Sequence, residues 1–254
     1  MLEVRGLTKH FLSIPAVDGV SFTAAAGEVT GYLGPNGSGK STTVKMITGL
    51  IEPTGGEIYY RGVPVLNNMT DFKRVIGYVP EEPYLYPYLT GAEYLELAGQ
   101  LRLISLERLW YKIEHFLKLF NLWEDRFTPI SSYSKGMRQK ILLAGALLDD
   151  PEIVILDEPF SGLDVNSGLI LRRMIQGLAA AGKVVLFSSH EMDTVEKICS
   201  RVVILHKGKI VANDSVEHLR TIMELPTLEE IYTQVATVQD TSVAAGELLA
   251  VMRR

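Results

Sequence analysis

The chain has 254 residues, 47% of them hydrophobic, which is enough for one large domain with a sizeable buried core. Its 25 basic and 30 acidic residues give a formal net charge of −5, which argues against a surface built for nucleic acid. The longest clear apolar run, at 141–148, is shorter than the roughly 18 residues of a membrane-spanning helix, so we expect a soluble chain that reaches a membrane only through a partner. The single cysteine, Cys199, has no thiol to pair with and is expected to be a small buried apolar residue.

The first third of the chain carries the patterns of β-strands. Short runs of apolar and β-branched residues, bounded by glycine or proline, predict strands at 2–9, 16–25, 27–34, 55–62 and 75–80. We expect an antiparallel β subdomain in this N-terminal part.

A change to helical periodicity marks residues 90–150. Thr90 is followed three residues later by Glu93, which is the pattern of a capping box at a helix start. Apolar residues then recur at helical spacing through 107–123. We therefore expect a mostly helical subdomain inserted at about 90–150.

Strands and helices alternate in the rest of the chain. The run EIVILDEP at 152–159 is apolar up to its acids, as expected of a strand buried on both faces of a parallel sheet. A helix at 166–181, a strand at 183–190, a helix at 191–200 and a strand-rich segment at 201–214 are expected to follow it. The predicted fold class is α/β, with a mostly parallel, doubly wound sheet. From about residue 226 the sequence is an amphipathic, partly helical tail.

The segment GPNGSGKST at 34–42 matches the phosphate-binding pattern G-x-x-x-x-G-K-[ST], between a predicted strand and a predicted helix. Its glycines let several backbone N–H groups point at one anion, and the helix N-terminus adds partial positive charge. Lys40 supplies a full charge to the β- and γ-phosphates of a nucleotide, and Ser41 supplies a hydroxyl to Mg²⁺. The nucleotide-binding residues expected in this P-loop are Gly34, Pro35, Asn36, Gly37, Ser38, Gly39, Lys40, Ser41 and Thr42.

Two acidic residues at the end of the predicted strand at 152–159 are candidates for the metal ligand and the general base that hydrolysis of a nucleotide requires. Asp157 is placed to direct Mg²⁺, and Glu158 is placed to polarise the attacking water as a general base. The alternative is an acidic pair in a surface loop, which the phosphate-binding loop upstream disfavours. The two motifs together predict a P-loop NTPase that uses Mg²⁺.

These motifs, in this order, resemble those of the nucleotide-binding subunits of ATP-binding-cassette (ABC) transporters. The resemblance covers roughly 2–225 and rests on GPNGSGKST, YVPEEP, YSKGM, ILDEP, SGLD and SSH. It implies an ABC ATPase domain at 1–225 and leaves a tail at 226–254 without an assigned role. It further implies that Phe11 stacks on adenine, although an ordinary core phenylalanine is the alternative. His190 would contact the γ-phosphate as a catalytic switch, and Asp164 would touch a second subunit.

The segment SSYSKGMRQK at 131–140 resembles the ABC signature, which is most often LSGGQ. In this family two subunits pack head to tail, so Ser134, Lys135, Gly136 and Met137 are expected to serve the nucleotide of the other subunit. Ser134 would hydrogen-bond the γ-phosphate, and its hydroxyl can also cap a helix. Gly136 would let backbone amides approach closely. Lys135 and Met137 replace the usual Gly and Gln, and Lys135 either attracts phosphate or points to solvent.

Glu81 is a second difference from the family pattern, after Lys135 and Met137. The family usually has glutamine in this loop, which senses Mg²⁺ and contacts the membrane partner. A carboxylate can still bind Mg²⁺, although it adds negative charge near the γ-phosphate. The expected metal ligands are therefore Ser41, Glu81 and Asp157. The variants YVPEEP and YSKGM are similar to those of the branch that serves ABC-2-type exporters.

The resemblance implies an ATPase subunit that forms a homodimer or heterodimer and drives a separate integral-membrane permease from the cytoplasmic face of the membrane. The resemblance to the ABC-2-type branch implies that the transport is export. The alternative is a soluble ABC ATPase acting on nucleic acid or the ribosome. The acidic balance, the single cassette and the short span between Ser41 and Ser134 disfavour it. A cassette that hardly hydrolyses ATP is disfavoured by the presence of both Glu158 and His190.

Overall fold

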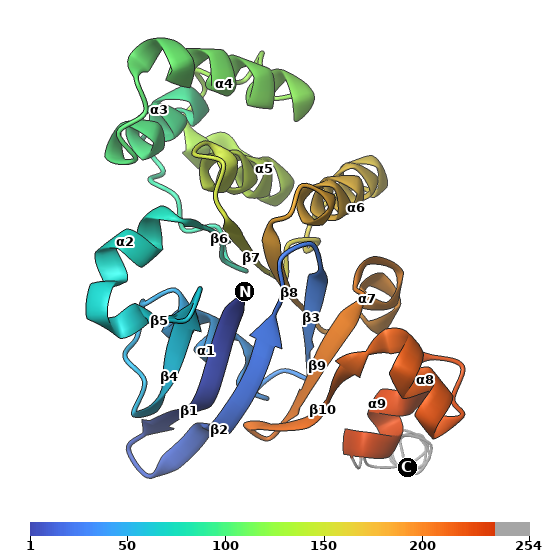
Figure 1. The fold of residues 1–254 in the computed structure, drawn as a ribbon. Helices are drawn as coiled ribbons and strands as arrows, with labels where there is room; N and C mark the ends of the chain where they lie inside the picture. The colour runs from blue at the N-terminus through green and yellow to red at the C-terminus, as the bar shows by residue number, and fades with distance from the viewer. Residues whose placement is uncertain (237–254) are drawn as a thin grey trace, which may run out of the picture.

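Two β-sheets and the helices around them make up the chain in the computed structural model, which describes residues 1–236 (Figure 1). The central sheet contains, in spatial order, β10 (Lys209–Ser215), β9 (Arg201–His206), β3 (Val29–Leu33), β8 (Val184–Ser189), β7 (Ile153–Asp157) and β6 (Ile76–Val79). The strands from β9 to β6 pair in parallel, and β10 runs antiparallel to β9 at one edge. This arrangement confirms the predicted mostly parallel sheet.

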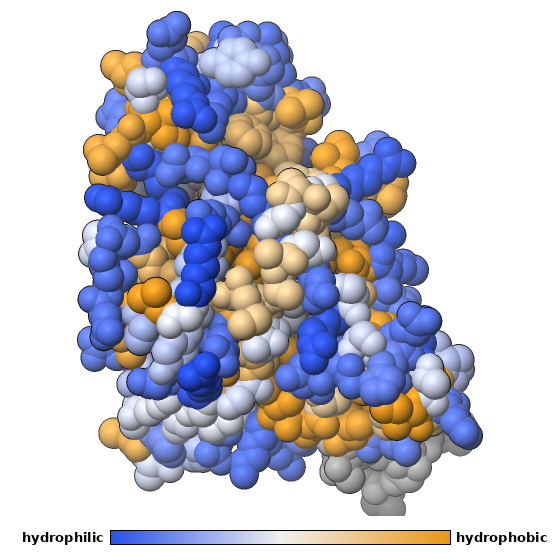
Figure 2. Space-filling model, in the orientation of Figure 1, coloured by the Kyte–Doolittle hydropathy of each residue, from blue (hydrophilic) through white to orange (hydrophobic). Residues whose placement is uncertain are grey.

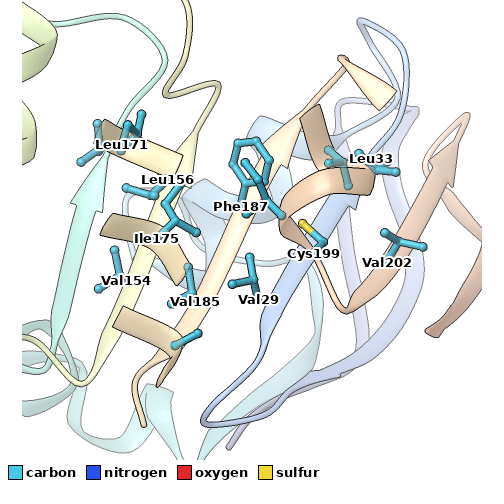
Figure 3. Close-up of a cluster of buried hydrophobic side chains, with 14 of the residues drawn as sticks. Val29, Leu33, Val154, Leu156, Leu171, Ile175, Val185, Phe187, Cys199 and Val202 are labelled. Atoms are coloured by element: carbon cyan, nitrogen blue, oxygen red, sulfur yellow. The ribbon is translucent and has the colours of Figure 1, made fainter. Parts of the chain in front are cut away.

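The central strands are buried on both faces. In β7, Val154 and Leu156 belong to one core while Ile153 and Ile155 belong to another, because successive side chains of a strand alternate in direction. Figure 3 shows the first core, where the sheet packs against α6 (Val165–Ala180). A sheet covered on both faces offers ligands the edge formed by the carboxyl ends of its strands.

The second core lies between the central sheet and an antiparallel sheet. The antiparallel sheet contains, in spatial order, β2 (Ile14–Ala24), β1 (Leu2–Phe11), β4 (Gly55–Tyr60) and β5 (Val63–Pro64). Helix α1 (Lys40–Ile47) follows β3 and contributes Val44, Met46 and Ile47 to this core. The predicted N-terminal antiparallel β subdomain is confirmed, and it packs against the helix that follows the phosphate-binding loop.

Helices α3 (Gly91–Leu101), α4 (Leu106–Leu119) and α5 (Lys135–Leu147) form the predicted insertion between β6 and β7, at the top of Figure 1. The predicted capping box is present: the Thr90 side chain accepts from the Glu93 amide, and the Glu93 carboxylate accepts from the Thr90 amide. A 3-10 turn (Ile130–Ser132) precedes α5, and the insertion has a core of its own. Within residues 1–236, none of the helices combines the length and apolarity needed to cross a membrane.

Helices α6, α7 (Met192–Ile198), α8 (Val216–Met223) and α9 (Leu228–Ala236) follow β7 in the chain. Cys199 is buried in the first core, as expected. Some elements of the structure are not predicted from the sequence, among them α8, α2 (Met69–Arg74) and the 3-10 turn before it (Val65–Asn68).

The described part of the C-terminal segment packs against the first core. Leu228 and Ile231 of α9 are fully buried there, just beyond the predicted domain boundary at 225. That boundary stays a prediction, and residues 237–254 of the predicted tail lie outside the described part of the chain.

Candidate functional site

The phosphate-binding loop joins β3 to α1 and depends on glycines at close approaches. Gly39 immediately precedes α1 with φ 107°, and a Cβ there would lie 2.6 Å from the carbonyl oxygen of Ala16. A Cβ on Gly34 would lie 2.5 Å from the carbonyl oxygen of Leu205. Larger residues at either position would displace the loop, so both glycines fix its shape.

A cavity of about 460 Å³ opens over this loop. Helix α1 begins without a side-chain cap, so the N–H groups of its first turn are available to hydrogen-bond an anion in the cavity. Ser38 instead packs behind the loop, where its carbonyl accepts from the Gly208 amide at 2.9 Å. The cavity is lined by Ala16, Pro35, Asn36, Gly37, Gly39, Lys40, Ser41, Thr42, Glu81 and Glu158.

Lys40 places a buried positive charge in the loop. Its Nζ donates to the Gly34 carbonyl at 2.7 Å and lies 4.0 Å from the Glu158 Oε1. Burial lowers the pKa of Lys40, and the carboxylates of Glu158, Asp157 and Glu81 oppose that shift. The charge of the Lys40 amine is therefore stabilised by the carboxylates around it, at one side of the cavity.

The two acids after β7 are held by the end of β8. Asp157 accepts a hydrogen bond from the Ser188 hydroxyl, and the Glu158 amide donates to the Ser188 carbonyl at 3.1 Å. Glu158 has a left-handed φ of 48°, a backbone conformation that is uncommon outside glycine. The sequence identifies Ser188 and Ser189 only as part of the SSH motif and does not predict these contacts. The pairing of β7 with β8 brings them to the acids.

The Glu158 carboxylate is the strongest candidate for a general base. The His190 Nδ1 lies 2.8 Å from its Oε1, and the Ser189 hydroxyl lies 3.4 Å from its Oε2. Burial raises the pKa of Glu158, while His190 and Lys40 oppose the rise. A carboxylate whose pKa is raised toward neutrality is a stronger base for water. Because Nδ1 contacts Glu158, His190 can contact a phosphate at the same time only through Nε2.

Phe11 ends β1 and is 50% exposed, so it is not a core residue. The Lys9 Nζ lies 5.4 Å from the centre of its ring. Phe11 pairs with Ile14, close along β2 to the Ala16 that lines the cavity. The exposed ring is available for stacking, and its role toward adenine stays a prediction.

The signature segment lies outside this cavity, whose lining residues include none of 134–137. Ser134 caps α5, and its Oγ accepts from the Met137 amide at 3.2 Å, as expected of a cap. The Lys135 Nζ donates to the Ser161 Oγ at 2.8 Å, so it does not simply point to solvent. Gly136 lies against the turn that contains Ser161 and Gly162. A Cβ on Gly136 would lie 3.0 Å from the Gly162 carbonyl oxygen.

Asp164 has a structural role that its motif did not reveal. Its carboxylate caps α6 by accepting from the Ser167 amide at 2.9 Å and from the Ser167 hydroxyl at 2.6 Å. Hydrogen bonds from Ser167 are the main cause that lowers the pKa of Asp164. The Lys140 Nζ lies 4.0 Å away, on α5. The expected contact of Asp164 with a second subunit stays a prediction.

The residues expected to hold Mg²⁺ offer hard oxygen donors, which suit this ion. Ser41 and Glu81 line the cavity, and Asp157 lies at the end of the adjoining strand. Among residues 1–236, three or more His, Cys, Asp or Glu side chains do not gather into a metal site. Mg²⁺ usually takes few protein ligands and completes its shell with phosphate oxygens and water, and the oxygen donors of Ser41, Glu81 and Asp157 fit that preference.

Comparison with known proteins places the chain among ATP-binding cassettes. The family model described as ABC transporter matches residues 17–161. An uncharacterized ABC transporter ATP-binding protein of Nostoc sp. is 42% identical over 81% of this chain and 62% of its own length. The ABC transporter ATP-binding protein NatA of Bacillus subtilis is 38% identical over 81% of this chain and 84% of its own length. Nod factor export ATP-binding protein I of Rhizobium meliloti is 36% identical over 83% of this chain and 63% of its own length.

Solved structures agree with this placement. A structure of an ATP-binding subunit of an ABC transporter matches with a TM-score of 0.87 and 33% identity, over 92% of this chain and 99% of that chain. The dimeric post-hydrolysis structure of the cassette MJ0796, bound to ADP and Pi, matches with a TM-score of 0.79 and 26% identity, over 85% of this chain and 99% of that chain. These matches confirm the predicted P-loop ATPase fold.

Proposed function

The chain belongs to the ABC transporter family and is an ATP-binding cassette with ATPase activity, and on that premise we propose that two copies close head to tail around two ATP molecules and drive a separate integral-membrane permease. The observation that carries this proposal is the separation of the two expected half-sites. Lys40 and Glu158 share one cavity, whereas Ser134 lies outside it at an exposed helix start. A second copy can bring its Ser134 to the nucleotide held in that cavity.

Within each composite site, the residues have distinct tasks. Lys40 and the first-turn amides of α1 bind the β- and γ-phosphates, and Phe11 stacks on the adenine. Glu158 takes the proton of the attacking water, and His190 holds that carboxylate in place through the 2.8 Å contact. Ser41, Asp157 and Glu81 would hold Mg²⁺, which neutralises phosphate charge when bound.

Closure of the dimer follows from differential affinity. ATP contacts the phosphate-binding loop of one copy and Ser134 of the other only in the closed state, so it favours that state. Hydrolysis and phosphate release remove the γ-phosphate contact and let the dimer open. The dimeric structure of MJ0796 with ADP and Pi supports such an assembly for a related cassette.

The surface beside Glu81 is the proposed contact with the permease. The loop after β6 exposes three tyrosines at alternate positions, with exposed fractions of 83% for Tyr84, 62% for Tyr86 and 92% for Tyr88. Exposed aromatic residues are typical of protein interfaces. Figure 2 shows further hydrophobic side chains on the helical insertion at the top of the view. This surface would place the cassette at the cytoplasmic face of a membrane, and the similarity to a Nod factor export protein supports export.

Reconstitution tests the transport function. The chain is co-expressed with a candidate polytopic membrane protein, and the purified complex is placed in liposomes. We expect the membrane protein to co-purify with the chain and ATP turnover to accompany transport. A complex that carries Glu158→Gln is expected to lose both ATP turnover and transport. Stimulation of the ATPase by nucleic acid or ribosomes, with no membrane complex formed, would instead support the soluble alternative.

Mixed dimers test the composite sites. A Ser134→Ala copy paired with a Lys40→Ala copy keeps one of its two composite sites intact. We expect the mixture to regain ATPase activity above that of either variant alone. A mixture that forms heterodimers without regaining activity would contradict independent composite sites.

A further inference from the structure

The start of α5 and the turn after Glu158 meet within one chain. The Lys135 Nζ donates to the Ser161 Oγ at 2.8 Å. A Cβ on Gly136 would lie 3.0 Å from the Gly162 carbonyl oxygen, and a Cβ on Gly162 would lie 3.0 Å from the Lys135 Cδ. Glycines thus allow the two backbones to approach, and Lys135 lies across the contact.

The same turn is fixed to the candidate general base. The Ser161 amide donates to the Glu158 carbonyl at 3.1 Å, and the Glu158 amide donates to the Ser188 carbonyl at 3.1 Å. One hydrogen-bonded turn therefore links Glu158 to Ser161. From Ser161 the Lys135 side chain continues the connection to Ser134, its neighbour in sequence and the cap of α5.

We propose that Lys135 is a positioning residue that holds the start of α5 against the Ser161 turn of its own chain and so sets where Ser134 meets the partner's nucleotide. This inference rests on the proposed function, because Ser134 reaches a nucleotide only in the closed dimer. In that dimer, Glu158 and Ser134 of one chain serve different nucleotides. The Lys135–Ser161 contact therefore connects the two composite sites through each chain.

ATP-driven dimerisation in a Glu158→Gln background tests this role. Lys135→Met, Ser161→Ala and the double variant are compared by the ATP concentration at half-maximal dimerisation, measured by analytical ultracentrifugation. Each single variant is expected to raise this concentration about fivefold, the effect of one partly exposed hydrogen bond to a charged group. The double variant is expected to raise it no further than either single variant, and Lys135→Arg is expected to stay near the parent value.

A matched control separates this contact from a loss of surface charge. Lys118→Met removes another exposed lysine of the helical insertion, whose partner is Glu114 in the same helix, and no shift is expected. A thermal midpoint equal to that of the parent shows that each variant folds.

Two results would overturn this inference and leave the proposed function standing. The first is a shift with Lys135→Met but none with Ser161→Ala, which would assign Lys135 directly to phosphate. The second is dimerisation at the parent's ATP concentration in all the variants. If the Glu158→Gln parent itself fails to dimerise with ATP, the proposed function fails and the inference fails with it.

Discussion

The phosphate-binding region and the signature region differ in how they hold their polar groups. Lys40, Asp157 and Glu158 are 6%, 2% and 8% exposed and are held against one another at the carboxyl edge of the central sheet. Ser134 and Asp164 are exposed and serve as caps of α5 and α6. The buried charges interact strongly because little water screens them, whereas the exposed caps are satisfied within their own helices.

This difference separates two kinds of function. The buried region is organised in a single chain and holds the groups proposed to bind phosphate and to activate water. In the proposed dimer, the exposed region gains a further function only when a second copy is placed against it. Changes in the first region should therefore act on chemistry and binding in one chain, and changes in the second should act on assembly.

The largest effect is expected from Glu158→Gln. Loss of the general base should lower kcat about 100- to 10,000-fold, while ATP binding is retained. Phosphate release measures the first quantity and isothermal titration the second. Turnover at the wild-type rate would remove Glu158 from the base role and weaken the view that the buried region supplies the group that activates water.

Lys40→Ala should weaken ATP binding about 10- to 100-fold, because a charge-assisted contact to phosphate is lost. Equilibrium titration of the single chain measures this. Lys45→Ala is the matched control, since Lys45 is exposed on the same helix and does not line the cavity. Equal affinities for the two variants would contradict the role given to Lys40.

Substitutions of Ser134 separate its cap from its expected contact with phosphate. Ser134→Ala removes the cap and should cost about 1 kcal/mol of stability, whereas Ser134→Asp keeps a capping oxygen. Both should weaken ATP-driven dimerisation, and the aspartate more strongly, because its charge repels the γ-phosphate. Thermal melts and ultracentrifugation give the two readouts. Normal dimerisation of Ser134→Asp would place the γ-phosphate elsewhere.

Glu81→Gln should produce the smallest effect, a shift in pH dependence. Burial is the main cause that raises the pKa of Glu158, and the negative charge of Glu81 adds to the rise, so removal of that charge lowers the pKa. Because the base must be deprotonated, the acidic limb of the kcat profile should move to lower pH. Glu82→Gln is the control, as Glu82 is exposed and does not line the cavity. A shift to higher pH, or none, would contradict this coupling.

The elements with strong local signals are predicted well from the sequence. The apolar run of β7 and the capping box of Thr90 and Glu93 identify their elements because the responsible contacts are periodic or only a few residues apart. Helices α2 and α8 are not predicted from the sequence. The hydrogen bonds from Ser188 to Asp157 and from Lys135 to Ser161 join residues 31 and 26 positions apart, which no local pattern specifies.

By itself, the sequence determined the phosphate-binding loop, the acidic pair and the helix caps at Thr90 and Ser134, since glycine geometry, charge and capping act over a few residues. The tertiary structure alone decided what surrounds them. Pairing of β7 with β8 brings Ser188 and His190 to the acids, and packing of the insertion brings Lys135 to Ser161. The reason is physical: the partner of a side chain depends on which distant segments bury their apolar faces together, and that is settled only when the whole core forms.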